Sequence, residues 1–347
     1  MNILGSAIAT SPAIWRDRGN GLLFVGLMAF AVYQLAQWTP IRALSISPLV
    51  LGIVCGMLYG NFLRGTMPVE WGVGVHFAAR RLLRVAVALY GLNISIQQIV
   101  DVGLPGMVVS VGIAVGVLAL GVWLGTRWLK LDRDTAMLTA AGSAICGAAA
   151  VLAFESTLRS APHKSAVAVA TVVLFGTISM FLYPVLYGVG WLPFEGTALG
   201  VFLGGSIHEV AQVVAAASNI DPATTEVATI VKMTRVALLV PLLLVIGLWL
   251  QRRDASLSGN KAKLPVPWFA IGFLVFALIN SLGVLSPTLL DTLRAIDIFL
   301  LTMAMTALGV ETRFAQMKAA GPRVLALAAM LFGILFGLTS FLVWLVF

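Results

Sequence analysis

The chain has 347 residues, of which 60% are hydrophobic and only 10% are charged, and its mean hydropathy is +1.01. Soluble domains contain about 45–50% apolar and about 25% charged residues, so this composition excludes an ordinary soluble protein. The net charge of +8 does not indicate nucleic-acid binding, because the basic residues are scattered over many connectors. We therefore expect a polytopic membrane protein whose surroundings are a lipid bilayer.

Apolar stretches follow one another along the whole chain, joined by short connectors. A transmembrane helix needs about 20 mostly apolar residues, and these stretches lack the alternation of a membrane β-barrel. We predict an all-α polytopic membrane fold with about ten or eleven transmembrane helices, at residues 21–38, 47–63, 75–94, 105–128, 135–158, 164–191, 196–218, 224–250, 267–285, 289–310 and 323–347. They form a single transmembrane domain over residues 1–347, with the first helix peripheral.

Basic residues in the connectors indicate the orientation of the chain. Lysine and arginine are enriched in the cytoplasmic connectors of membrane proteins. With a cytoplasmic N-terminus, most of the basic residues fall inside, including those of the polar connector at residues 251–265. The sequence therefore predicts a multi-pass protein whose N-terminus is cytoplasmic.

Internal similarity indicates repeats, although several alignments compete. Residues 83–93 resemble residues 293–311, and the passage at 142–150 resembles the passage that begins at Gly204. These pairings do not fit one tandem duplication, and glycine-rich membrane helices also look alike by chance. We predict inverted repeats at about 47–191 and 196–347, as in many secondary transporters, and leave their phase open.

The first unusual passage is Gly142-Ser143-Ala144-Ile145-Cys146-Gly147. Glycine costs about 1 kcal/mol relative to alanine inside a helix, so a break near mid-membrane is expected here. A half-helix N-terminus at such a break would favour an anion, with Ser143, Cys146 and Gly147 in contact with it. Close packing of unbroken helices through small residues is the alternative interpretation.

The second passage, which starts at Gly204, adds Ser206, His208, Glu209 and Gln212 to the same kind of small-residue stretch. His208 and Gln212 are four residues apart and share a helix face. Ionisable residues inside a membrane span are costly, and they usually mark a functional site. We predict a second break here, with Ser206, His208 and Gln212 contacting substrate and Glu209 binding a coupling ion. A helix cap near the membrane surface is the alternative.

Lys232 and Arg235 lie three residues apart in a helix that continues apolar to Leu250. Two interpretations are open: the two cations bind an anionic substrate, or they form structural ion pairs with Glu209, Glu226 or Glu311. Glu311 ends another apolar stretch, so it is either a second ion-coupling carboxylate or a surface residue.

No enzyme motif is present. The three histidines and two cysteines show no metal-ligand spacing, and no phosphate-binding glycine loop occurs. We therefore expect no catalytic residues, no metal and no cofactor.

Three ordered passages carry a family resemblance: residues 143–150, residues 205–216 and Lys232-Met233-Thr234-Arg235-Val236. Together they resemble the YeiH-like family of bacterial inner-membrane proteins, described as sulfate exporters, over nearly the whole chain. The resemblance implies a location in the bacterial inner (plasma) membrane. It also implies a fold like that of transporters in which broken helices cross in a mobile core beside a scaffold.

We thus expect a secondary active transporter of a small anionic solute, such as sulfate or a sulfonate, coupled to protons or sodium. The alternatives are a cation/proton antiporter and a channel or receptor-like membrane protein. The solute, the coupling ion, the direction of transport and the oligomeric state, including a homodimer, stay open at this point.

Overall fold

The computed structural model describes residues 12–38, 47–63, 65, 67–253, 268–313 and 321–347. Most of the basic connector predicted at residues 251–265 lies outside these residues. Within them, every predicted stretch contains helix and there is no β-strand, which confirms the all-α fold class.

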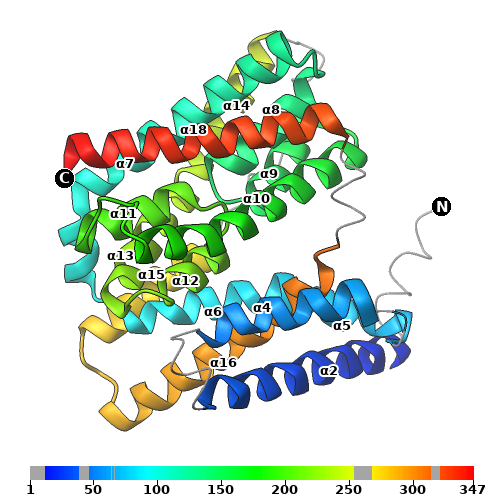
Figure 1. Cartoon of the computed structure of the whole chain (residues 1–347), viewed down its shortest axis with the longest axis vertical. Coiled ribbons are helices and arrows are strands. Elements are labelled where there is room, and N and C mark those ends of the chain that lie inside the picture. Colours follow the sequence, from blue (N-terminus) through cyan, green and yellow to red (C-terminus); the bar gives the residue numbers. More distant parts are fainter. Residues whose placement is uncertain (1–11, 39–46, 64, 66, 254–267, 314–320) are drawn as a thin grey trace. The chain divides into compact units, whose positions relative to one another are not determined.

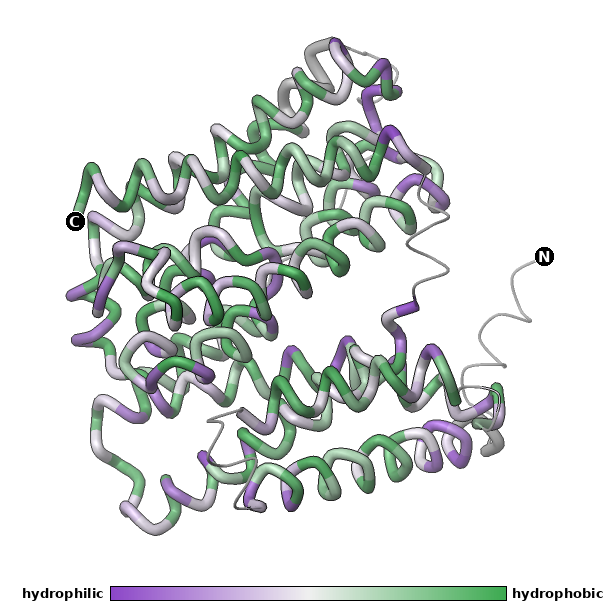
Figure 2. Tube along the Cα trace, in the orientation of Figure 1, coloured by the Kyte–Doolittle hydropathy of each residue, from purple (hydrophilic) through white to green (hydrophobic). Residues whose placement is uncertain are grey.

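Six helical segments in the described part of the chain are long and apolar enough to cross a membrane: Trp15–Gln37, Ile96–Trp128, His163–Gly188, Pro222–Gly247, Pro287–Glu311 and Pro322–Val346. They belong to α2 (Pro12–Gln37), α7 (Ile96–Trp123) with η6 (Leu124–Trp128), α10 (Pro162–Gly188), α13 (Pro222–Ala237) with α14 (Leu239–Arg253), α16 (Pro287–Glu311) and α18 (Pro322–Val346). Figure 2 shows helices that are hydrophobic along most of their length. The remaining predicted spans are shorter or broken helices.

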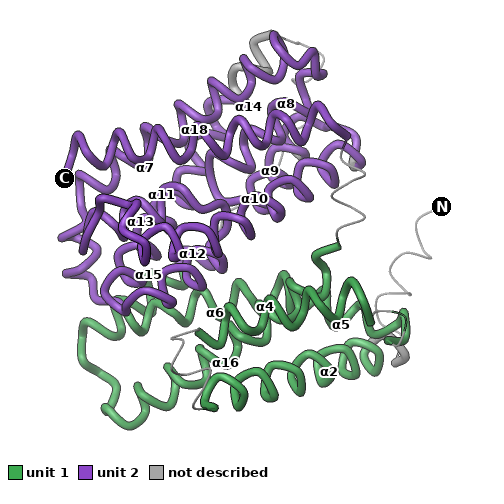
Figure 3. The backbone as a smooth tube through the Cα atoms, in the orientation of Figure 1, with its two compact units in different colours: residues 1–93, 272–314 green, residues 94–271, 315–347 purple. Residues whose placement is uncertain are grey.

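The chain forms two compact units, residues 1–93 with 272–314 and residues 94–271 with 315–347 (Figure 3). One of the three boundaries between them along the chain falls within α15 (Trp268–Ser281). Each unit combines two segments that are separated in the chain, so the units do not coincide with the predicted repeats. The inverted repeats stay a prediction.

Unit 1 contains α2, α4 (Pro48–Leu58) with η1 (Tyr59–Leu63), α5 (Gly72–Phe77), η4 (Ala78–Leu82), α6 (Leu83–Leu89), η5 (Tyr90–Asn93) and α16 (Figure 1). Glycines let α4 and α16 touch through their backbones: a Cβ on Gly56 would overlap Thr306 O, and one on Gly309 would overlap Ile53 O. Such close approach through small residues is the usual basis of helix association in membranes.

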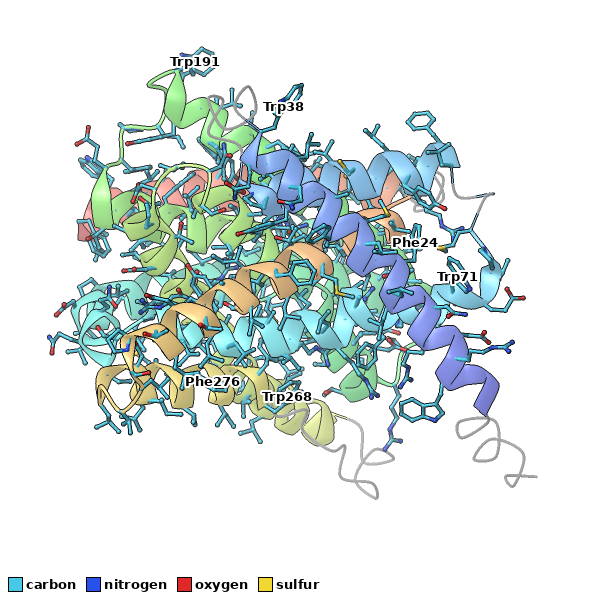
Figure 4. The ribbon with its side chains drawn as sticks, turned by 90° about the horizontal axis from the view of Figure 1, so that it is seen from below. Phe24, Trp38, Trp71, Trp191, Trp268 and Phe276 are labelled. Carbon is cyan, nitrogen blue, oxygen red and sulfur yellow. The ribbon has the colours of Figure 1, made fainter. Side chains whose placement is uncertain are left out.

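Aromatic residues join α2 to the rest of unit 1. The Phe24 ring centroid lies 5.0 Å from that of Tyr59 and 6.1 Å from that of Trp71, which belongs to η3 (Val69–Trp71). Figure 4 shows Phe24 and Trp71. Trp38, the residue that follows α2, is exposed instead, as expected for a tryptophan at a membrane interface.

Unit 2 contains α7, η6, α8 (Arg133–Ala144), α9 (Ala148–Leu158), α10, α11 (Gly196–Ser206), α12 (Val210–Ala217), α13, α14 and α18. Small residues again set the spacing: a Cβ on Gly121 would lie 2.6 Å from Ala140 Cβ, so α7 packs closely on α8. The Tyr183 ring of α10 contacts Phe202 of α11 and Phe336 of α18, with centroids 5.2 and 5.9 Å away. The helices α7, α10 and α18 thus pack against two interrupted helices, α8 with α9 and α11 with α12.

Asp132 begins the first interrupted helix. Its carboxylate accepts from the Thr135 backbone N–H at 3.2 Å, as an N-cap residue does, and from Lys164 Nζ at 2.5 Å. Partial burial alone would raise the pKa of Asp132, but the hydrogen bonds from Lys164 and Thr135 outweigh it and lower the pKa to about 2. The start of α8 is therefore fixed by an ionised cap.

Candidate functional site

Two helices of unit 2 are interrupted where the sequence predicts it. Between α8 and α9, Gly147 adopts a φ of 77°, which favours glycine. Between α11 and α12, Ile207 and Glu209 are extended, with ψ values of 148° and 151°. Each interruption leaves carbonyl groups at the end of one half-helix and N–H groups at the start of the next without partners in their own helix.

Lys232 of α13 contacts both interruptions at once. Its Nζ donates hydrogen bonds to Ile145 O at 3.1 Å and to Ile207 O at 2.6 Å. The side chain is fully buried. A cation is favourable at the C-terminal end of a helix because the carbonyl groups there carry partial negative charge. Lys232 therefore joins the ends of α8 and α11.

Arg235, one turn further along α13, binds the same two helix ends. Its NH2 donates to Ser143 O at 3.1 Å and to Ala144 O at 2.6 Å, and its NH1 donates to Gly204 O and Gly205 O. The planar guanidinium suits such a paired arrangement, with each terminal nitrogen serving one half-helix. These contacts are not the structural ion pairs that the sequence offered as one alternative, because Lys232 and Arg235 donate to backbone carbonyls. Binding of an anionic substrate by the two cations stays a prediction.

The glycines before the second interruption bring α13 close enough for these bonds. A Cβ on Gly204 would overlap Ala228 O, and one on Gly200 would lie 2.6 Å from Val227 Cβ. The backbones of α11 and α13 therefore approach each other directly, and Lys232 and Arg235 extend from this contact to the broken ends.

Glu209 lies at the N-terminal ends of the other two half-helices, α9 and α12. As the N-cap residue of α12, it accepts at Oε1 from the backbone N–H of Ala148, the first residue of α9, at 3.1 Å. A Cβ on Gly147 would overlap Glu209 Cγ and lie 2.9 Å from its Oε1. One carboxylate thus sits beside the start of both α9 and α12, where a negative charge is favoured. Glu209 is partly exposed, unlike the two cations.

Gln212 fixes this arrangement from within α12. Its Oε1 accepts from the Glu209 backbone N–H at 3.2 Å, while its Nε2 approaches Val173 O and Thr177 Oγ1 of α10, each at 3.5 Å. The sequence predicts Gln212 as a substrate contact, and in the structure its side chain positions Glu209.

The other predicted contact residues lie in or beside the interruptions. Ser206 is buried and donates to Phe202 O at 2.6 Å, and Cys146 is a buried free thiol. His208 is also buried, and its Nδ1 has no hydrogen-bond partner among the described residues. Ser143 is buried as well, in the last turn of α8.

Glu311 is the one predicted site residue that unit 2 does not contain. It ends α16 in unit 1, where its Oε1 lies 2.9 Å from His76 Nδ1 and its Oε2 lies 4.0 Å from Arg80 Nε. Its side chain is one-quarter exposed. The contacts are those of a helix-end carboxylate paired with basic neighbours.

Asp297 is a buried acidic residue that the sequence reasoning missed. It lies in α16 and is fully buried. The available signal was an aspartate inside the apolar run Ile296-Asp297-Ile298-Phe299-Leu300.

Comparison with known proteins places the chain in a family. Residues 20–328 match the family described as "Conserved hypothetical protein 698". A UPF0324 membrane protein of Bordetella pertussis is 71% identical over 323 residues, covering 92% of this chain and 93% of the relative. The chain belongs to the UPF0324 family of membrane proteins.

Other UPF0324 proteins match over a similar length. A relative from Pseudomonas putida is 58% identical, covering 91% of this chain and 90% of its own length, and one from Pseudomonas aeruginosa is 41% identical, covering 90% of both. The YeiH-like family that the sequence resembles is this same family. No solved structure matches the chain.

Proposed function

We propose that this UPF0324 protein is a secondary active transporter, not an enzyme, that moves a small anion of the sulfate or sulfonate type across the bacterial inner membrane. Transport is coupled to protons or sodium and proceeds by alternating access. The resemblance to proteins described as sulfate exporters supports outward transport. The lipid bilayer and the anion are the partners that this role requires, and a homodimer is compatible with it.

The observation that carries the proposal is the convergence of two half-helix N-termini, those of α9 and α12, on one carboxylate. Helix N-termini bind anions through free N–H groups and the helix dipole. Discontinuous helices that meet near mid-membrane form the substrate sites of many secondary transporters. In our proposal, a substrate oxyanion takes the place of the Glu209 carboxylate beside the Ala148 N–H.

The remaining residues have complementary roles in the proposal. Lys232 and Arg235 hold the C-terminal ends and keep two positive charges beside the substrate. Ser143, Cys146, Gly147, Ser206, His208 and Gln212 form the polar and close-packed surroundings of the bound anion. Glu209, displaced by the anion, binds the coupling ion, and Glu311 is a second carboxylate for coupling.

The experiment uses purified protein reconstituted into liposomes. Uptake of radiolabelled sulfate by sulfate-loaded vesicles is expected to saturate with concentration and to respond to an imposed proton or sodium gradient. Sulfate, sulfite, thiosulfate and sulfonates are compared as competitors, with chloride as the reference anion. A thermal-shift series with the same compounds reports binding independently, because a ligand of the folded state raises its stability.

A matched pair of glycine variants tests whether the flux uses this site. Gly147→Ala puts a Cβ against Glu209 and strains a positive φ, so saturable uptake should be lost. Gly333→Ala in α18 adds a Cβ that meets nothing within 4 Å, so uptake should persist. Flux that neither saturates nor follows a gradient would identify a channel. Proton-linked cation exchange without anion flux would identify a cation/proton antiporter.

A further inference from the structure

Asp297 presents a carboxylate without a partner in the interior of unit 1. The residue has no exposed surface, and neither of its carboxylate oxygens has a hydrogen-bond partner among the described residues. Buried polar groups are nearly always hydrogen-bonded, so an unpaired buried carboxylate needs an explanation.

The depth of Asp297 makes its position more unusual. It lies ten residues after Pro287 in the 25-residue span Pro287–Glu311, about 15 Å along the helix axis at 1.5 Å per residue. The hydrocarbon core of a bilayer is about 30 Å thick, so Asp297 falls near its middle. An isolated ionised carboxylate in such surroundings is so unfavourable that the group takes up a proton instead.

Several basic residues lie on α16 or on the segments packed against it. The basic residues described next contact groups other than Asp297. His76 and Arg80 contact Glu311, which is 14 residues beyond Asp297 and about 21 Å further along the axis. Arg294 donates to Leu92 O at 3.1 Å. The ionisable residues of the packed segments are Arg16, Asp17, Arg18 and Tyr33 in α2, Cys55 in α4, Tyr59 in η1, His76 in α5, Arg80 and Arg81 in η4, Arg84 in α6 and Tyr90 in η5.

A metal cation suits this position poorly. Hard cations are bound by several oxygen ligands at once. No group of three His, Cys, Asp or Glu side chains gathers as a candidate metal site within the described ranges. A proton needs only one carboxylate oxygen.

We propose that Asp297 is the site that binds the coupling proton. Asp297 holds a proton while it is buried, and it exchanges that proton with water when a conformational change opens a path to one side of the membrane. Only an O–H bond forms and breaks: the carboxylate takes one proton from water on one side and returns it to water on the other. This inference rests on the proposed function, chooses the proton over sodium as the coupling ion, and assigns the binding of that proton to Asp297 instead of to Glu209 or Glu311.

The first test measures protonation without transport. Infrared spectra of purified protein should contain the C=O band of a protonated carboxyl group, and Asp297→Asn should remove it. Asp291→Asn is the matched control, because Asp291 lies on the same helix and is 77% exposed. An unchanged carboxyl band in Asp297→Asn would show that Asp297 is ionised, and the proposal would be wrong.

The second test measures coupling in proteoliposomes that contain a pH-sensitive dye. Wild type and Asp291→Asn should acidify or alkalinise the lumen as sulfate moves, whereas Asp297→Asn should carry sulfate downhill without a dye signal. Sulfate-linked proton flux that persists in Asp297→Asn would overturn the proposal, even if the infrared band had disappeared. If wild type moves no anion at all, the proposed function fails, and with it the coupling role, although the infrared result still reports whether Asp297 is protonated.

A conservative variant provides a separate test in case Asp297→Asn does not fold. Asp297→Glu keeps an acid at the site, so the infrared band should shift in frequency and proton coupling should return at least in part. If the asparagine variant does not fold, an unshifted band in Asp297→Glu contradicts the inference.

Discussion

Glu209 Oε1 accepts a hydrogen bond from the Ala148 backbone nitrogen, 3.1 Å away, although the two residues are 61 positions apart in the chain. On the other side of the interruptions, Lys232 and Arg235 bind the carbonyl ends of α8 and α11. The positive N-terminal ends of α9 and α12 thus lie beside a carboxylate, and the negative C-terminal ends of α8 and α11 lie beside two cationic side chains. The charges within unit 2 are arranged around the dipoles of its broken helices.

Glu209→Gln tests this relationship at the N-terminal ends. Glutamine keeps an oxygen acceptor but removes the charge that favours the helix starts, which in partly buried positions is worth up to about 2 kcal/mol. We expect a lower melting temperature than in wild type. Because the variant no longer places its own anion at the N-termini, added sulfate should raise the melting temperature more than it does in wild type.

Glu195→Gln is the control for that experiment. Glu195 is also an N-cap residue, of α11, but it is exposed and makes no side-chain capping bond. Its melting temperature and its response to sulfate should match those of wild type. An equal sulfate response in Glu209→Gln and wild type would mean that the carboxylate does not compete with the anion.

Lys232→Met tests the carbonyl ends. Methionine is similar in size to lysine but donates no hydrogen bond, so the carbonyls of Ile145 and Ile207 lose their Lys232 donor. Each buried group left unsatisfied costs about 1–3 kcal/mol. Thermal unfolding can be followed by maleimide labelling of buried Cys146 in a Cys55→Ser background.

Lys232→Met should react at a clearly lower temperature than the Cys55→Ser parent. Arg127→Met, which removes an exposed cation in the same unit, should not shift the transition. Equal transitions for the two methionine variants would show that Lys232 does not stabilise the interruption.

The interruptions themselves could be predicted from the sequence, because glycine weakens a helix locally and ionisable residues rarely occur in apolar spans. The partners of those residues could not. Arg235 and Ser143 are 92 positions apart, and the bond between them depends on how closely α11 and α13 pack at Gly204. The sequence favoured substrate or carboxylate partners for the two cations, because nothing in it indicates which backbone carbonyls lie nearby.

The division into two units also could not be predicted from the sequence pattern. Apolar stretches of similar length give no indication that α16 packs with α2 and α4. Gly56 and Gly309 allow the close backbone contact between α4 and α16, and glycines are abundant throughout the chain. Local composition therefore predicted the helices, whereas their grouping depended on long-range contacts.

Arg235→Lys separates charge from geometry. A lysine keeps the positive charge but offers one compact ammonium group, which cannot reproduce two parallel pairs of bonds to separate helix ends. We expect a lower melting temperature than in wild type and a smaller loss than in Arg235→Met, measured by the same Cys146 labelling. If Arg235→Lys is as stable as wild type, charge alone is sufficient and the four carbonyl contacts contribute little.

The cap of α8 predicts a defined dependence on pH. The pKa of Asp132 is lowered to about 2, so its stabilising contribution is complete above the ordinary aspartate pKa of about 3.9 and is lost as pH falls through 2.

Asp132→Asn keeps an acceptor for the Thr135 N–H but loses the ion pair with Lys164, whereas Asp132→Ala loses both. Because Asp132 is about half exposed, the ion pair should add only about 0.2–1 kcal/mol, and the cap about 0.5–2 kcal/mol. Melting temperatures should therefore decrease in the order wild type, asparagine, alanine from pH 7 to 5, and the gap between wild type and asparagine should close towards pH 2. A gap that widens on acidification would contradict the assigned ion pair.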